Sequence, residues 1–188
     1  MKAKQNTNMK LGLTVIDKQL TMRELILEKL AEIEERENIK ILHCVESGSR
    51  AWGFASPDSD YDVRFIYVRP KEFYLRLDKT RDVIEWQLDD TLDINGWDIK
   101  KALTLLHSSN PTLFEWNSSP ILYKTTDAWA NISKVINRYF VAKSGIYHYL
   151  STAKRNYKEF LLGDTVKCKL LVQIDRVWSQ QNPATQSQ

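Results

Sequence analysis

The sequence shows no pattern of disulfides, cysteine-bound metal, membrane-spanning segments or a signal peptide. Its two cysteines, Cys44 and Cys168, fit neither a disulfide framework nor a metal-ligand spacing. No apolar run is long enough to span a bilayer, and the first eight residues lack the apolar stretch of a signal peptide. Glycine and proline are scarce, and 43% of the residues are hydrophobic, as in ordinary globular proteins. These absences favour a cytoplasmic protein with its own apolar core and no membrane partner.

The charges are divided unevenly along the chain. Residues 1–99 contain 15 Lys and Arg against 19 Asp and Glu, whereas residues 100–188 contain 12 against 5. A basic half beside an acidic half would guide a phosphate-bearing substrate toward a bound cation. Solvated faces of amphipathic helices carry similar charges, so both interpretations stay open.

Hydrophobic periodicity predicts an α+β protein: a small mixed β-sheet with flanking helices and a helical C-terminal region. Strands are expected over residues 39–45, 60–68, 82–88 and 91–97. Helices are expected over 21–38, from Asp98 to the break at Asn110-Pro111, from there to before Ser118, and from Asp127 in two segments divided near Ser144-Gly145.

The same patterns suggest how the chain is divided. Residues 1–20 are expected to be a disordered head, and residues 21–123 a catalytic domain. Residues 124–178 would form the helical C-terminal region, and the polar residues 179–188 a disordered tail.

Two neighbouring motifs carry the chemical signal. Gly48-Ser49 opens a short helix after an apolar strand, and its backbone N–H groups can face a phosphate. Asp60 and Asp62 follow at the start of the next strand. Alternate residues of a strand share a face, so these carboxylates lie about 6.6 Å apart along it. Paired carboxylates suit hard cations such as Mg²⁺ or Mn²⁺. Metal and phosphate together indicate chemistry on a nucleotide.

This order of strand, Gly-Ser turn, short helix and Asp-x-Asp strand resembles the nucleotidyltransferase superfamily of DNA polymerase β. Within it, three segments resemble the RNA-repair-associated (RlaP/YcgL-like) group of nucleotidyltransferases. They are Gly48-Ser49-Arg50-Ala51-Trp52-Gly53, the stretch Ser56-Pro57-Asp58-Ser59-Asp60-Tyr61-Asp62-Val63-Arg64, and Trp97-Asp98-Ile99-Lys100-Lys101. The resemblance runs from about Ile41 to Tyr123 and more weakly beyond.

The resemblance implies roles for the matched residues. Asp60 and Asp62 would bind two divalent ions, while Gly48 and Ser49 would hold the β- and γ-phosphates of a nucleoside triphosphate. A third carboxylate would lie on a neighbouring strand, near the attacking hydroxyl. Ions about 3.5–4 Å apart would stabilise both the attacking and the leaving oxygen.

Three residues are candidates for the third carboxylate: Glu85, Asp93 and Asp98. Asp93 lies inside a strand that ends just before a helix, where the family places this acid. Asp98 stands at a helix start, where an N-cap explains it, and Glu85 would be an exposed cross-strand partner. The sequence favours Asp93.

Three basic residues are candidate phosphate contacts. Arg64 shares a face with Asp60 and Asp62, so it would contact the triphosphate or clamp a carboxylate. Arg50 lies in the first turn of the short helix, where exposure to solvent is the other explanation. Lys101 follows on a helix, where lysines are usually solvated.

The sequence thus predicts a metal-dependent nucleotidyltransferase. It would transfer a nucleoside monophosphate from a nucleoside triphosphate to a hydroxyl of an RNA end, a protein or a small molecule, and release pyrophosphate. The alternative is a regulatory module with the same fold that binds a nucleotide or a partner without turnover. Oligomeric state, nucleotide and acceptor stay open.

Overall fold

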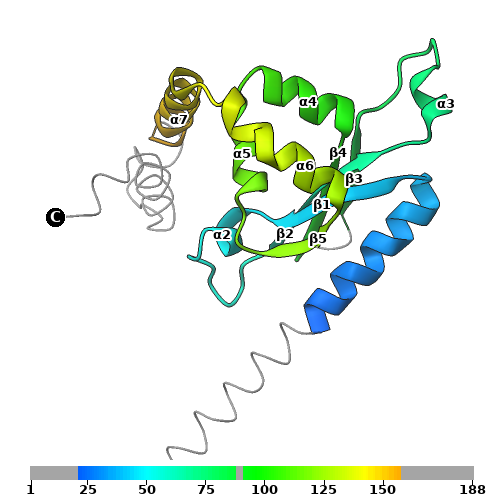
Figure 1. The fold of residues 1–188 in the computed structure, drawn as a ribbon. Helices are drawn as coiled ribbons and strands as arrows, with labels where there is room; N and C mark the ends of the chain where they lie inside the picture. The colour runs from blue at the N-terminus through cyan, green and yellow to red at the C-terminus, as the bar shows by residue number, and fades with distance from the viewer. Residues whose placement is uncertain (1–20, 88–90, 158–188) are drawn as a thin grey trace, which may run out of the picture.

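The computed structural model describes residues 21–87 and 91–157. Five strands of this part form one mixed sheet in the order β3-β4-β2-β1-β5 (Figure 1). They are β1 (Lys40–Glu46), β2 (Tyr61–Val68), β3 (Val83–Gln87), β4 (Leu92–Asp98) and β5 (Leu122–Thr125). Only β2 and β4 are parallel neighbours; the other pairs are antiparallel. The predicted α+β class with a mixed sheet is confirmed.

One face of the sheet is covered by the helix that includes residues 21–37. Its buried residues Ile26, Leu30 and Ile33 pack against strand residues such as Val63 and Phe65. The helix ends at Asn38, whose φ of 49° is left-handed and stops further helical hydrogen bonding. The apolar spacing that predicted this helix is therefore the spacing of its buried face.

The opposite face is covered by three helices (Figure 1). They are α4 (Ile99–His107), α5 (Pro111–Asn117) and α6 (Asp127–Ile136). Their buried side chains Leu106, Trp116 and Trp129 share a cluster with Val45 and Ile66 of the sheet. The sheet is thus the middle layer of three.

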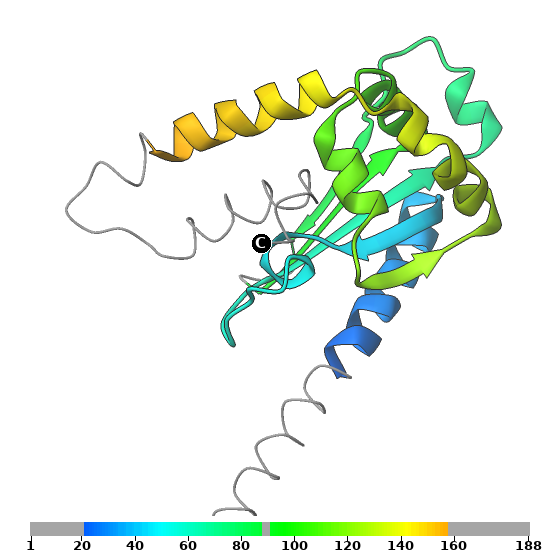
Figure 2. The ribbon, with the colours of Figure 1, turned by 60° about the vertical axis from the view of Figure 1, so that its left-hand side comes forward.

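The remaining elements are shorter or peripheral. They are α2 (Gly48–Ala51), α3 (Lys71–Tyr74), the 3₁₀ turn η1 (Asn137–Tyr139) and α7 (Ala142–Asn156). Helix α7 extends beyond the edge of the sheet (Figure 2). It is tied to α5 by the Tyr149 hydroxyl, which donates to Glu115 at 2.6 Å. None of the helices in the described ranges is long and apolar enough to cross a membrane.

Most predicted elements are found within two residues of their expected limits, with two differences. The division of the C-terminal helices was predicted near Ser144-Gly145, which is wrong: the break follows η1, and both residues lie in the first turn of α7. Strand β5 was not predicted. The predictions of a disordered head over residues 1–20 and a disordered tail over residues 179–188 concern residues outside the described ranges.

His43 belongs to the apolar core. Its side chain is 7% exposed and its ring stacks on Trp129, with ring centres 5.0 Å apart. Burial lowers its pKa from 6.5 to about 4, although a backbone hydrogen bond at Trp116 opposes the shift.

This pKa predicts acid sensitivity. Below pH 6.5 the unfolded chain binds a proton at His43 and the folded chain does not, so stability falls as pH drops toward 4. We expect this residue to account for about 3 kcal/mol of the loss in free energy of unfolding. Urea unfolding across this pH range should show a shallower loss for His43→Phe than for wild type. Exposed His107→Gln is the control, and equal slopes for all three proteins would contradict the prediction.

Candidate functional site

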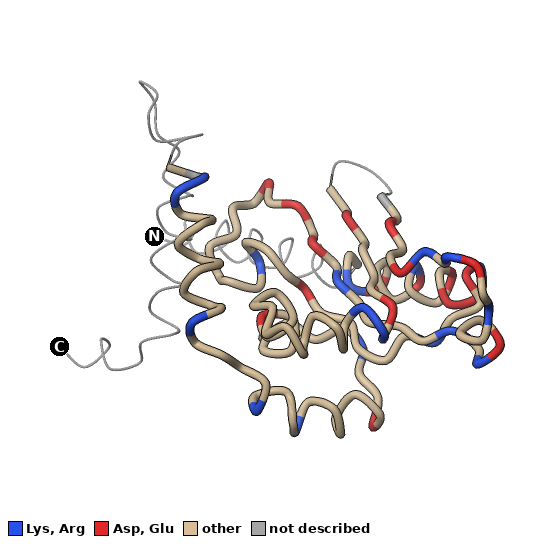
Figure 3. Tube along the Cα trace, turned by 90° about the horizontal axis from the view of Figure 1, so that it is seen from above, with Lys and Arg blue, Asp and Glu red and all other residues tan. Residues whose placement is uncertain are grey.

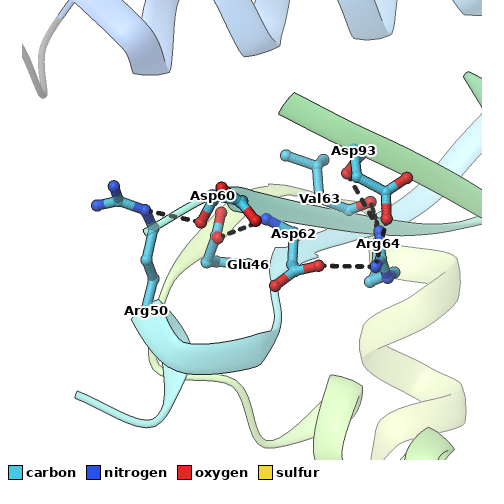
Figure 4. A network of polar contacts seen from close by, with 7 residues as sticks. All are labelled: Glu46, Arg50, Asp60, Asp62, Val63, Arg64 and Asp93. Atoms are coloured by element: carbon cyan, nitrogen blue, oxygen red, sulfur yellow. Dashed lines mark hydrogen bonds and ion pairs between the residues drawn. The ribbon is translucent and has the colours of Figure 1, made fainter. Parts of the chain in front are cut away.

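Asp62 and Asp93 lie side by side because β2 and β4 run parallel. The two residues are register partners, each one place past the first residue of its strand. Arg64 lies between them: its Nη2 donates to Asp62 Oδ1 at 2.9 Å and to Asp93 Oδ2 at 2.7 Å (Figure 4). The guanidinium offsets the repulsion that two adjacent carboxylates would otherwise have.

The carboxylates stand on the face of the sheet that carries α4, α5 and α6. The next residue along each strand, Val63 and Ile94, points to the opposite face and packs in the core beneath the helix of residues 21–37, because side chains alternate along a strand. The side chains are partly accessible, with exposed fractions of 31% for Asp62 and 47% for Asp93. The site therefore opens to solvent at the edge where both strands begin.

Gly48 brings the turn against Asp62. Its φ of 59° is left-handed, and a Cβ at this position would lie 2.0 Å from Asp62 Oδ2. Ser47, the residue before it, donates its N–H to the Asp62 carbonyl at 2.8 Å. Only glycine lets the chain turn this sharply and leaves room for the carboxylate. The predicted closeness of the Gly-Ser turn to the second aspartate is therefore observed.

Asp60 lies just before β2 and not in it, and Arg50 binds the backbone next to Asp60. Asp60 is exposed and precedes the first residue of β2. Its carbonyl accepts a hydrogen bond from Arg50 Nε at 3.0 Å, and the Ser59 carbonyl accepts one from Arg50 Nη2. The guanidinium also lies 3.6 Å from the centre of the Tyr61 ring. Arg50 thus holds the loop that carries Asp60; its predicted phosphate contact stays a prediction.

The geometry separates the three candidates for the third carboxylate. Asp98 lies at the other end of β4, buried as the N-cap of α4, where it accepts from Lys100 N and the Tyr74 hydroxyl. Glu85 pairs with Arg81 on an exposed surface of β3. Asp93 is the candidate beside Asp62. The Lys101 Nζ lies 3.6 Å from Asp82 Oδ1, at the end of β4 that carries Asp98 and not at the end that carries Asp93.

Glu46 is a residue that sequence reasoning missed. It ends β1 with no exposed surface, and its carboxylate accepts from the Asp62 N–H at 2.8 Å and the Tyr123 hydroxyl at 2.6 Å. Burial raises its pKa, while these two hydrogen bonds act in the opposite direction. A signal was present in the sequence: a charged residue closes a mainly apolar strand two residues before Gly48.

A divalent ion fits the chemistry of this donor set. Asp60, Asp62 and Asp93 supply hard carboxylate oxygens, and Gly48, which has no Cβ, leaves room for the Asp62 carboxylate. In the described ranges, however, no three His, Cys, Asp or Glu side chains are gathered in a ligand cluster. Arg64 holds one oxygen of Asp62 and one of Asp93 in the arrangement seen here.

Comparison with known proteins identifies the family. The family described as "RNA repair pathway DNA polymerase beta family", RlaP, matches residues 22–178. The chain belongs to the RlaP family. A curated relative, "Uncharacterized protein YcgL" of Bacillus subtilis (strain 168), is 48% identical over 149 residues. That match covers 79% of this chain and 57% of the relative. The resemblance predicted from the motifs is thus confirmed, and the polymerase-β-like family indicates a nucleotidyltransferase type of function.

The contact between Gly48 and Asp62 predicts unequal effects of two glycine substitutions. Gly53 also has a positive φ, 72°, but is exposed. Gly53→Ala should lower the free energy of unfolding by about 1 kcal/mol through backbone strain alone. Gly48→Ala should lower it by about 1–3 kcal/mol more, because its methyl group meets the Asp62 carboxylate. Urea unfolding measures both, and equal losses would contradict the contact.

Arg64 should compete with a divalent ion for the same carboxylates. In Arg64→Met the two aspartates lose their shared cation, so the variant should be less stable than wild type in EDTA. Excess Mg²⁺ should then raise its melting temperature by more than it raises that of wild type. Arg81→Met, which breaks the exposed pair with Glu85, is the control and should respond to Mg²⁺ as wild type does. An equal response in all three proteins would exclude competition.

Proposed function

We propose that this chain is a metal-dependent nucleotidyltransferase that moves a nucleoside monophosphate from a nucleoside triphosphate to a hydroxyl acceptor. The observation that carries the proposal is the convergence of Asp62, Asp93 and the Gly48 turn at one accessible edge of the sheet. Membership of a polymerase-β-like family supports the same assignment. The chain spans 57% of the YcgL relative, so the activity is proposed for this chain from its own residues.

The acidic side chains would hold Mg²⁺ or Mn²⁺. Asp60, Asp62 and Asp93 are the proposed ligands, with Arg64 turning away from at least one carboxylate. When bound, the ions supply charge neutralisation at the phosphates and lower the pKa of a coordinated hydroxyl. Arg50 holds the backbone carbonyl of Asp60, but the Asp60 side chain is exposed and precedes β2, so its carboxylate can turn toward the site while the strand stays in place.

The Gly48 turn would bind the triphosphate. Helix α2 has four residues, so its dipole is small, and binding would depend on individual N–H groups and the Ser49 hydroxyl. Arg64, once released, and Arg50 are the proposed cationic contacts. Electrostatic attraction from the C-terminal half would assist, since the described helix α7 carries Lys143, Lys154 and Arg155 and no acid (Figure 3).

The proposed reaction is a substitution at the α-phosphorus. The acceptor oxygen forms a bond to this phosphorus, the bond to the oxygen bridging to the β-phosphate breaks, and pyrophosphate leaves. The acceptor proton passes to a carboxylate at the site, for which Asp93 is the proposed group. An RNA 3′ end is the first acceptor to test because the family description names RNA repair; proteins and small molecules are the others.

Ligand-induced stabilisation tests the proposal. Melting temperatures are measured with each of the four nucleoside triphosphates, with and without Mg²⁺ or Mn²⁺. A saturating pair should raise the melting temperature of wild type by roughly 5–10 °C. Asp62→Asn should lose this rise, because a neutral amide is a weaker ligand, whereas Asp127→Asn, at an exposed position in the first turn of α6, should keep it. No rise with any pair would contradict the proposed site.

The alternative is a regulatory module that binds a nucleotide or a partner without turnover. The Arg64 bridge favours it, since a cation already satisfies two of the proposed ligands. Transfer of α-³²P label from the stabilising nucleotide to RNA, protein or small hydroxyl compounds separates the two functions. Label transfer that Asp62→Asn abolishes supports the enzyme. Stabilisation without transfer to any acceptor class supports the binding module.

A further inference from the structure

Glu46 lies at the end of the β1–β2 ladder, where a side chain replaces a backbone carbonyl as the acceptor for one strand N–H. In the β1–β2 ladder Glu46 is opposite Val63, so the next pair is Ser47 with Asp62. The Ser47 N–H donates to the Asp62 carbonyl at 2.8 Å, whereas the Ser47 carbonyl accepts from the N–H of Ala51, the last residue of α2. The Asp62 N–H donates to Glu46 Oε1. A side-chain carboxylate thus serves the N–H at the point where the strand turns into the helix.

The same carboxylate reaches a third strand. Glu46 Oε2 accepts from the Tyr123 hydroxyl on β5, and the Glu46 carbonyl accepts from Ser119 Oγ at 2.5 Å. The Glu46 N–H donates to the Ile121 carbonyl at 2.9 Å. A buried carboxylate is costly unless each oxygen has a donor, and here both do. The residue therefore joins β1, β2 and β5 directly behind the candidate site.

These contacts leave Asp62 little freedom. Its carbonyl is held by Ser47 and its N–H by Glu46, so the backbone that carries the carboxylate is fixed on both sides. Gly48 then packs against the carboxylate itself. We propose that Glu46 is a positioning residue of the metal–nucleotide site: it holds the Asp62 backbone so that the carboxylate presents its oxygens to a divalent ion. This inference rests on the proposed function, because it concerns the same site.

Four variants separate positioning from general stability. Glu46→Met keeps the side-chain length and removes both acceptors. Tyr123→Phe removes the hydrogen bond to Oε2 and keeps the one to Asp62, so it is the matched control. Glu46→Gln keeps an amide oxygen for the Asp62 N–H, while its NH₂ can donate to the Tyr123 oxygen; it is the conservative rescue. Glu46→Asp, which withdraws the carboxylate by one methylene, is the second disruptive variant should Glu46→Met not fold.

The first measurement needs no metal. Amide hydrogen exchange at Asp62, followed by NMR, should accelerate at least tenfold in the disruptive variant. Exchange at Val63 and Phe65 should stay near the wild-type rate, because their partners on β4, Ile94 and Gly96, are unchanged. Tyr123→Phe and Glu46→Gln should keep the protection of Asp62. Unchanged exchange at Asp62 in the disruptive variant would overturn the proposal.

The second measurement is Mn²⁺ affinity, by electron paramagnetic resonance on the folded proteins. We expect binding at least about tenfold weaker in the disruptive variant, as for partners that orient a metal ligand. Tyr123→Phe and Glu46→Gln should stay within about threefold of wild type, even where their melting temperatures fall. Disruptive and wild-type proteins with equal affinity would reduce Glu46 to a structural role. Should wild type itself show no binding that Asp62→Asn abolishes, the proposed function fails, and this proposal with it.

Discussion

The parallel pairing of β2 with β4 sets Asp62 opposite Asp93 at the edge where both strands begin. Like charges in such a position destabilise the pairing unless a cation lies between them. Arg64, two residues after Asp62 and therefore on the same face, supplies that cation. The sheet can thus keep two carboxylates side by side at one edge, on the face that carries α4, α5 and α6.

The turn beside these strands depends on a second constraint, which concerns the backbone. The chain bends from β1 into α2 beside Asp62. The residue at this bend must have a positive φ and no Cβ, and Gly48 meets both conditions. The Asp62 N–H then receives its acceptor from the Glu46 side chain. Gly48 lets the turn approach Asp62 closely, and Glu46 supplies the acceptor for the Asp62 N–H, which has no backbone carbonyl opposite it at the turn.

Local patterns predicted much of this arrangement. The apolar runs before Gly48 and after Asp60 are strong strand signals, and Asp98 was recognisable as an N-cap. Strand β5 was not predicted because it is four residues long and none of them is buried, so Leu-Tyr-Lys-Thr lacks an apolar pattern. Only its pairing with β1 makes this segment a strand. Arg50 looked like a phosphate ligand because only the fold brings the Ser59 and Asp60 carbonyls and the Tyr61 ring to it. Glu46 was missed because its partners are 16 and 77 residues away.

The polar groups of the site differ in how easily they can exchange partners. Asp93 is nearly half exposed and Asp62 about a third, so water and ions can compete with Arg64 for these carboxylates. Glu46 has no exposed surface, and removal of either of its donors would leave a buried oxygen without a partner. The exchangeable contacts are therefore those of the side chains that would meet a ligand. The contact that fixes the Asp62 backbone is the one that cannot exchange, and this division lets the carboxylates change partner while the strand beneath them stays in register.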